Sequence, residues 1–220
     1  MKLCMIGTGY VGLVSGTCFA DIGNQVYCVD KDKNKIDKLN SGISPIYEPG
    51  LDELIKKNYN ANRLIFTTDI KKAINSSDLI FICVGTPTKK GSLKVDLSFV
   101  YKCVKEILKY TKKKKIIITK STVPVGTGDE IEKIIKKKKK LFSIISNPEF
   151  LREGEAIRDF RFPDRIVIGS DNKNEFKTMR KLYSPLISKG AKFFTTSRKG
   201  AELIKYASNA FLATKITFIN

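Results

Sequence analysis

Short apolar runs alternate with segments of helical character along most of the chain. Six runs predict strands, at Lys2–Ile6, Gln25–Val29, Leu64–Thr67, Leu79–Val84, Ile116–Thr119 and Phe142–Ser146. Two further runs, Arg165–Gly169 and Lys192–Thr195, bracket a helical segment at Glu175–Tyr183 and either extend the sheet or flank it. Continuously apolar strands such as LIFICV are typical of strands that are covered on both faces. The alternation therefore predicts an α/β fold, with a doubly wound, mainly parallel sheet and helices on both of its faces.

The last segment, Arg198–Asn220, has no interior proline and predicts a single helix of about six turns. From Ala201 onward it is largely apolar, so we expect most of its faces to be buried. Lys205 and Asn209 are four residues apart and share one face of this helix. Buried there, they need either polar partners or a ligand. The pattern stops at Asn220 without a helix-ending signal, which indicates a cut.

The composition limits which side chains can bind a metal or take part in catalysis. The 220 residues include five cysteines without a CxxC pair and no histidine, so no metal site is expected. Acid–base chemistry then depends on carboxylates, lysines, hydroxyls or water. No apolar run approaches the ~18–20 residues that span a membrane, and no signal peptide precedes the first strand. We expect a cytoplasmic protein with no membrane partner.

The formal charge of +19 raises the alternative of nucleic-acid binding. Two tracts carry much of the excess, Lys112–Lys115 and Lys136–Lys140. Each lies between a helix and the next strand, which places it at the edge of the sheet opposite to the nucleotide-binding edge. Neither tract has interleaved aromatic residues for base stacking. We interpret both as solvated loop charges and expect no nucleic-acid partner.

A glycine-rich turn follows the first predicted strand. The sequence Gly7-Thr8-Gly9-Tyr10-Val11-Gly12 joins that strand to a helix, and Asp30 ends the next strand. Gly7 permits a sharp turn, Gly9 permits close approach of a pyrophosphate, and Gly12 permits close packing of the helix. An acid at Asp30 accepts hydrogen bonds from ribose and repels a 2′-phosphate. The pattern predicts a Rossmann-like unit for NAD rather than NADP, against the alternative of a plain strand-to-helix turn.

Two other loops that follow strands carry hydroxyl groups. Gly85–Thr88 ends a strand where a nucleotide would lie, although a plain Gly-Pro turn is the alternative. After the next strand, Thr127 and Glu130 have the spacing of a capping box. Ser121 and Thr122, just before them, have no such local structural role.

A pair of carboxylates follows the sixth strand, at Glu149 and Glu153, with Arg152 between them. One interpretation is a surface salt bridge. The other is a carboxylate that manages a proton or a water near a reacting centre.

Over its whole length the chain resembles UDP-glucose 6-dehydrogenases, within the UDP-glucose/GDP-mannose dehydrogenase family. The resemblance rests on MKLCMIGTGYVGLVSGTCFADIGNQVYCVD, PIYEPGLDEL, VGTPT, TKSTVPVGTG, SNPEFLREGEAIRDF, PDRIVIGS and AELIKYASNAFLATKITFIN. It implies oxidation of UDP-glucose to UDP-glucuronate, with two NAD reduced per turnover. It also implies an NAD-binding domain over 1–196 and, over 197–220, the start of a central dimerisation helix. A homodimer or higher oligomer is expected for the full-length protein.

The resemblance also implies roles for individual residues. The NAD site would comprise Gly7, Gly9, Tyr10, Val11, Gly12, Asp30, Lys35, Thr86, Pro87, Ser121 and Glu153. Glu149 would be the acid or base of thioester hydrolysis, and Thr122 would order the water. Lys205 and Asn209 would stabilise an oxyanion. The sugar nucleotide would contact Glu149, Phe150, Leu151, Arg152, Lys205 and Asn209.

One departure from the family is large. The cysteine that forms the thiohemiacetal and thioester lies, in the family, in a Gly-Phe-Gly-Gly-Ser-Cys-x-Pro-Lys-Asp stretch, and nothing here matches it. The UDP-binding C-terminal domain is also absent. We therefore expect a cofactor-binding half that is inactive alone. A truncated, non-catalytic NAD-binding module and a dehydrogenase for GDP-mannose or UDP-N-acetylmannosamine are the alternatives.

Overall fold

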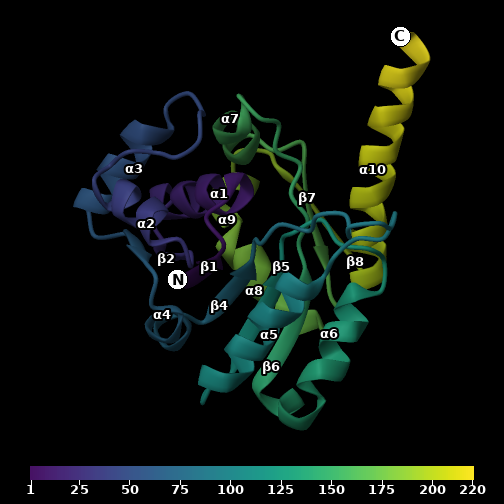
Figure 1. The fold of residues 1–220 in the computed structure, drawn as a ribbon, viewed down its shortest axis with the longest axis horizontal. Helices are drawn as coiled ribbons and strands as arrows, with labels where there is room; N and C mark the ends of the chain where they lie inside the picture. The colour runs from purple at the N-terminus through teal and green to yellow at the C-terminus, as the bar shows by residue number, and fades with distance from the viewer.

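A computed structural model describes residues 1–220 and contains one eight-stranded sheet (Figure 1). The strands are β1 (Lys2–Ile6), β2 (Gln25–Val29), β3 (Leu64–Thr67), β4 (Leu79–Ile82), β5 (Lys115–Thr119), β6 (Phe142–Ser146), β7 (Arg165–Gly169) and β8 (Lys192–Thr196). Their order is β3-β2-β1-β4-β5-β6-β7-β8. Every neighbouring pair is parallel except β6 and β7, which are antiparallel and share the single register pair Ser146 and Gly169. The predicted doubly wound, mainly parallel sheet is confirmed.

Helices cover both faces of this sheet, because alternate strand residues point to opposite sides. Leu3 and Met5 of β1 belong to one core, whose helices are α1 (Tyr10–Asp21), α2 (Lys33–Asn40), α3 (Leu51–Asn60), α7 (Ala156–Arg161), α8 (Lys173–Leu182) and α9 (Ser184–Ile187). Cys4 and Ile6 belong to the other, with α4 (Ile70–Ser76), α5 (Ser98–Tyr110) and α6 (Thr127–Ile135). Phe19 of α1 lies at the centre of the first core, against the rings of Phe81, Phe160 and Tyr183.

The first lysine tract lies where α5 leads into β5, and the second lies where α6 leads into β6, at the same end of the molecule (Figure 1). Residues 136–140 form an exposed 3-10 helix, η1 (Lys136–Leu141). Lys115 differs from the prediction of a solvated loop charge, because it is the first residue of β5 and only 6% exposed. Its ammonium donates to the carbonyls of Asn75 and Ser77, where α4 ends. Lys115 is therefore a structural cap of α4.

Helix α6 is not capped as its sequence predicted. Thr127 is the first residue of the helix, after Gly126 at the N-cap with a φ of +97°, so the expected capping box with Glu130 is wrong. The Thr127 hydroxyl donates to the carbonyl of Pro124 instead. The helix amides of Gly126 and Gly128 donate to the carboxylate of Glu202, at 2.7 and 2.8 Å. The cap thus comes from the last helix, 74 residues away from Gly128 in sequence.

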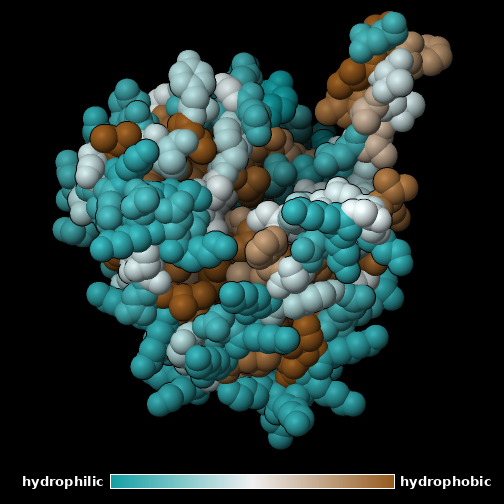
Figure 2. Space-filling view, in the orientation of Figure 1, coloured by the Kyte–Doolittle hydropathy of each residue, from teal (hydrophilic) through white to brown (hydrophobic).

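That last helix, α10 (Arg198–Ile219), packs on the sheet only through its first two turns (Figure 1). Its buried residues are Arg198, Ala201, Glu202 and Lys205. The second half projects from the domain and exposes apolar side chains, seen in brown in Figure 2, among them Phe211, Leu212, Ile216, Phe218 and Ile219. The expectation that most faces of this helix are buried is wrong for the 220-residue chain, in which all five of these residues are more than half exposed. No helix in the structure combines the length and apolar character needed to cross a membrane.

Candidate functional site

The turn between β1 and α1 needs glycine at two positions for packing. Gly7 has a φ of +98°, and a Cβ added to it would lie 2.8 Å from the carbonyl oxygen of Cys83. A Cβ on Gly12 would overlap the carbonyl oxygen of Gly7 and lie 3.0 Å from the Cβ of Cys83. Gly9 is different, because no atom lies within 4 Å of the position of its Cβ. Gly7 and Gly12 are thus explained by the fold, whereas the space over Gly9 is open to a ligand.

Asp30 lies beside this turn, directly after the end of β2. Its carboxylate accepts from the amide and hydroxyl of Thr8 at 3.0 and 2.8 Å, and from the amide of Asp32 at 3.1 Å. Lys35 completes the set with an ion pair of 3.1 Å. Burial acts to raise the pKa of Asp30, but these hydrogen bonds outweigh it and lower the pKa to about 2. The carboxylate is therefore ionised at neutral pH and available as an acceptor.

The hydroxyl groups after β4 and β5 hold these two loops together. Thr86 donates to the carbonyl of Thr122 at 2.9 Å. Ser121 donates to the carbonyls of Val84 and Ile82, at 2.7 and 3.2 Å. It therefore has a structural role toward a segment 37 to 39 residues away, which the sequence did not reveal. Ser121 and Thr122 also line a small cavity that includes Lys205.

A buried carboxylate, Glu48, joins the glycine turn to the loop after β6. Glu48 is 6% exposed and accepts from the Tyr10 hydroxyl and from the amides of Gly154 and Ile157. The Gly154 amide also lies 2.9 Å from the Tyr10 hydroxyl. Burial and the bond with Glu48 raise the pKa of Tyr10 to about 12, which keeps its proton in place. We did not identify Glu48 from the sequence, because its partners are 38 or more residues away.

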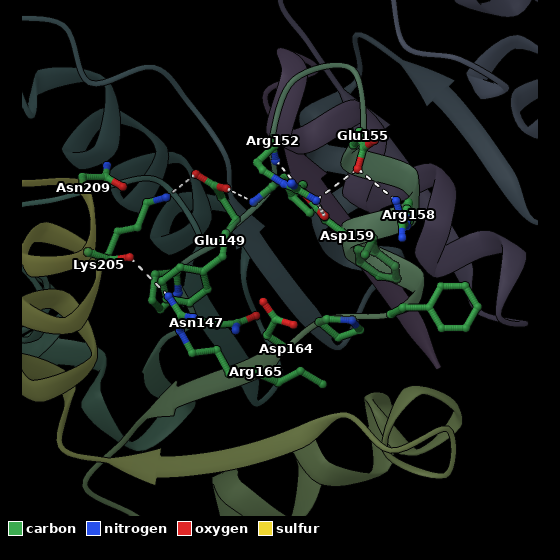
Figure 3. A pocket seen from close by; sticks show the side chains of 18 of the residues that line it. Asn147, Glu149, Arg152, Glu155, Arg158, Asp159, Asp164, Arg165, Lys205 and Asn209 are labelled. Atoms are coloured by element: carbon green, nitrogen blue, oxygen red, sulfur yellow. Dashed lines mark hydrogen bonds and ion pairs between the residues drawn. The ribbon is translucent and has the colours of Figure 1, made fainter. Parts of the chain in front are cut away.

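A cavity of about 850 Å³ opens between the loop after β6, the start of β7 and α10 (Figure 3). It brings together all six residues expected to contact a sugar nucleotide: Glu149, Phe150, Leu151, Arg152, Lys205 and Asn209. The residues of the glycine turn and Asp30 do not line it. The structure thus separates the expected site residues into two groups, which the Tyr10–Glu48–Gly154 contacts connect.

Glu149 and Lys205 form an ion pair of 3.0 Å in this cavity, with side chains 12% and 9% exposed (Figure 3). The other oxygen of Glu149 accepts from the amide of Leu151 at 2.7 Å, which fixes the carboxylate. Two cations contact the Phe150 ring: the Lys205 ammonium lies 5.3 Å and the Arg165 guanidinium 4.2 Å from the centroid of the ring. Asn209 lies one turn after Lys205 and is exposed, not buried as expected.

Arg152 pairs with neither of the carboxylates that flank it in sequence. Its guanidinium donates to Asp159 at 2.7 and 3.0 Å and to Glu155 at 3.1 Å. Glu149 instead pairs with Lys205, and Glu153 is exposed. The interpretation as a surface salt bridge therefore applies to Arg152, whereas the ion pair of Glu149 is largely buried inside the cavity.

A second lysine, Lys120, lines the same cavity and was not among the expected site residues. It follows β5 directly, is 4% exposed, and its ammonium has no hydrogen-bond or ion-pair partner in the protein, whereas Lys205 pairs with Glu149. Burial lowers the pKa of Lys120. Sequence reasoning missed it because its position after β5 looked like any loop start.

None of the five cysteines resembles a nucleophile. All are free and buried, and none lines the cavity. Burial raises the pKa of Cys18 and Cys83 to about 12 and that of Cys103 to about 11, and it raises the pKa of Cys4 and Cys28 as well. A thiol with so high a pKa is unreactive at neutral pH.

The strand, glycine turn and helix, with an acid after the next strand and a polar cavity nearby, define the nucleotide-binding domain of a dehydrogenase. Residues 1–187 match the model of the UDP-glucose/GDP-mannose dehydrogenase family, NAD binding domain. The chain belongs to this family, and its cofactor is NAD.

Relatives and solved structures agree with this assignment. The chain is 53% identical to the UDP-glucose 6-dehydrogenase of Rhizobium meliloti (strain 1021), over 100% of the chain and 51% of that protein. For the enzyme of Bacillus subtilis (strain 168) the identity is 50%, over 100% of the chain and 47% of that protein. A ternary complex of GDP-mannose dehydrogenase from Pseudomonas aeruginosa superposes with a TM-score of 0.93 at 37% identity, covering 99% of the chain and 51% of that structure. A UDP-glucose dehydrogenase from Pyrobaculum islandicum also gives 0.93, at 36% identity and the same coverage. The chain spans about half the length of these relatives.

Proposed function

We propose that the chain is the cofactor-binding half of an NAD-dependent dehydrogenase that oxidises C6 of UDP-glucose to the carboxylate of UDP-glucuronate. The observation that carries the proposal is the position of the Glu149–Lys205 pair. It lies in a cavity tied through Gly154, Glu48 and Tyr10 to the glycine turn of the NAD site.

The residues around the glycine turn fit a dinucleotide. The open space over Gly9 and the free amides of Gly9, Tyr10 and Val11 at the start of α1 suit a pyrophosphate. Asp30, ionised and held by Lys35, suits ribose hydroxyls. We assign Thr86, Pro87, Ser121 and Glu153 to the remaining walls of this site. When bound, NAD supplies the hydride acceptor.

The cavity residues suit the substrate side of the reaction. Glu149 is placed to accept or return a proton at its carboxylate, and Thr122 borders the adjoining small cavity, where it can orient a water. Lys205 and Asn209 offer donors to a developing oxyanion. Phe150, Leu151 and Arg152 line the approach of the sugar nucleotide, with the Arg152 backbone fixed by the bond of its amide to Asp159.

The choice of sugar rests on sequence rather than on shape. The structures of a GDP-mannose dehydrogenase and of a UDP-glucose dehydrogenase superpose equally well. The curated relatives at 43–53% identity are UDP-glucose 6-dehydrogenases, which favours UDP-glucose. GDP-mannose and UDP-N-acetylmannosamine are the sibling substrates to test.

We further propose how the chain is divided. Residues 1–196 form the NAD-binding domain, and residues 197–220 begin a central helix. The exposed apolar residues of this helix, such as Phe211 and Ile216, would pack against a second copy of the protein. We propose a cytoplasmic location for the assembled enzyme, where NAD and nucleotide sugars are available.

Two measurements test the function. The 220-residue chain is titrated with NAD by calorimetry, and we expect binding. The complete polypeptide encoded by the gene is assayed for NADH formation with UDP-glucose, GDP-mannose and UDP-N-acetylmannosamine, and we expect turnover with UDP-glucose. NAD binding without turnover of any sugar by that polypeptide would support the alternative of a non-catalytic NAD-binding module.

A further inference from the structure

The cavity holds an unbalanced set of buried charges. Its floor contains two lysines and one carboxylate, Lys120, Lys205 and Glu149, each with no more than 12% of its residue or side chain exposed. Glu149 is already committed to Lys205 at 3.0 Å and to the amide of Leu151. If both lysines are protonated, the set carries one uncompensated positive charge.

No other protein group supplies the missing negative charge to Lys120. The groups that face it from neighbouring elements are the Cys83 thiol after β4, Glu149 after β6 and Lys205 of α10, with the Tyr183 hydroxyl in the same cavity wall. Burial raises the pKa of both Cys83 and Tyr183, so both remain neutral near pH 7. The Tyr183 hydroxyl is also committed to Asn147 at 2.7 Å.

An unpaired buried ammonium is costly, and a protein sheds that cost by releasing the proton. The lowered pKa of Lys120 is consistent with this. The lysine is buried in the fold but lines the cavity, so a ligand oxygen can reach the position that no protein oxygen fills.

We propose that Lys120 is a further ligand-binding residue, whose ammonium pairs with an anionic oxygen of the bound ligand and so completes the Lys120–Glu149–Lys205 cluster. The inference rests on the proposed function, in which the product carries a carboxylate at C6 and the substrate an uncharged alcohol. Pairing with the carboxylate raises the pKa of Lys120 again, so the fraction of Lys120 that is unprotonated before the ligand binds takes up a proton from solvent and forms an ammonium–carboxylate pair.

The test compares UDP-glucuronate with UDP-glucose, which differ only at C6. Binding of each to the complete polypeptide with NADH is measured by calorimetry in two buffers of different ionisation enthalpy, which gives the number of protons taken up. For the wild type we expect greater proton uptake with UDP-glucuronate than with UDP-glucose.

Two variants distinguish the effect of the positive charge at position 120 from the effect of proton uptake there. Lys120→Met removes the ammonium, and we expect UDP-glucuronate to bind about 10- to 100-fold more weakly, as for loss of a charge-assisted hydrogen bond, with no excess proton uptake. Lys120→Arg keeps a charge that does not titrate, so it should retain tight UDP-glucuronate binding but lose the excess proton uptake. Affinity for NAD should stay unchanged in both.

Lys115→Met is the matched control, because Lys115 is also a buried lysine of the same strand region but lies outside the cavity. It should leave the difference between the two nucleotide sugars unchanged. The inference is overturned if Lys120→Met preserves that difference, or if Lys120→Arg retains the excess proton uptake. Failure of the wild type to bind either sugar, with NAD still bound, would overturn the proposed substrate and this inference with it.

Discussion

The contrast between Gly9 and Gly12 gives a sharp test of the cofactor site, because the two glycines lie three residues apart but meet different surroundings. Gly9→Ala adds a methyl group where no protein atom lies within 4 Å, at a φ of −70° that alanine adopts readily. Alanine is a poorer N-cap than glycine by roughly 0.5–1 kcal/mol, and the reduced freedom of the unfolded chain, worth about 0.4–1 kcal/mol, offsets most of that cost. We expect the free energy of unfolding to change by less than about 0.5 kcal/mol.

NAD binding should nevertheless fall. The new methyl group occupies the space through which the pyrophosphate approaches the amides at the start of α1, and each hydrogen bond lost to a charged group is worth about 1.5–3 kcal/mol. Loss of one such bond weakens NAD binding about 10- to 100-fold. Gly12→Ala behaves differently, because its methyl group overlaps the Gly7 carbonyl and forces α1 away from β1. We expect it to lose both NAD binding and about 2–3 kcal/mol or more of stability.

The assay pairs urea unfolding, which gives stability, with calorimetric titration of NAD into the 220-residue chain. The expected pattern is a stable Gly9→Ala with about 10- to 100-fold weaker NAD binding, and an unstable Gly12→Ala. Wild-type NAD affinity in Gly9→Ala would show that the open space over the turn is not where the cofactor lies. Equal destabilisation by the two substitutions would refute the packing argument.

Three further predictions concern single side chains. Asp30→Asn should weaken NAD binding while Glu149→Ala, in the other group of residues, leaves it unchanged. Because the pKa of Asp30 falls from 3.8 to about 2 on folding, the wild type gains about 1 kcal/mol after allowance for solvent screening. That gain is present above pH 4 and lost as the pH falls toward 2, so urea unfolding of Asp30→Asn and wild type should converge there. Glu202→Ala leaves the amides of Gly126 and Gly128 without an acceptor and should lower the free energy of unfolding by about 2–4 kcal/mol, measured by chemical denaturation. Glu155→Ala removes an exposed acid and should lower it by less than about 0.5 kcal/mol. Tyr10→Phe removes the hydroxyl between Glu48 and Gly154 and should speed amide hydrogen exchange of Gly154 severalfold; unchanged exchange would mean that Glu48 alone holds the loop.

Local patterns were enough to predict the first six strands of the sheet, but they left open whether the last two runs, now β7 and β8, belong to it. The bounds of β1, β2, β3, β6 and β7 agree with the apolar runs, because strands covered on both faces leave a continuous apolar signature. The glycine turn and Asp30 were likewise visible, since their spacing within one βαβ unit is fixed by local geometry.

Contacts between distant segments were not predictable in the same way. The cap of α6 by Glu202 spans 74 residues, and the local Thr127–Glu130 spacing pointed to the wrong cap. Lys115 appeared to belong to a lysine tract, because nothing in the tract shows that its last member enters a strand and reaches the end of α4. Glu48 and Lys120 escaped notice for the same reason, since burial is a property of the assembled fold.

The contact between β6 and β7 has the fewest paired residues in the sheet. A single register pair connects the first six strands, which are parallel to one another, to β7 and β8. The first turns of α10 contact the elements on both sides of this strand pair. Arg198 donates hydrogen bonds to Asp129 and Glu132 of α6 and forms an ion pair with Asp171, which follows β7. Glu202 accepts a hydrogen bond from Ser146 at the end of β6. The first turns of α10 therefore hold the two parts of the sheet together. Lys205 in the same part of the helix holds Glu149 through an ion pair. A change that loosens α10 from the sheet would therefore also loosen the Glu149 carboxylate in the cavity.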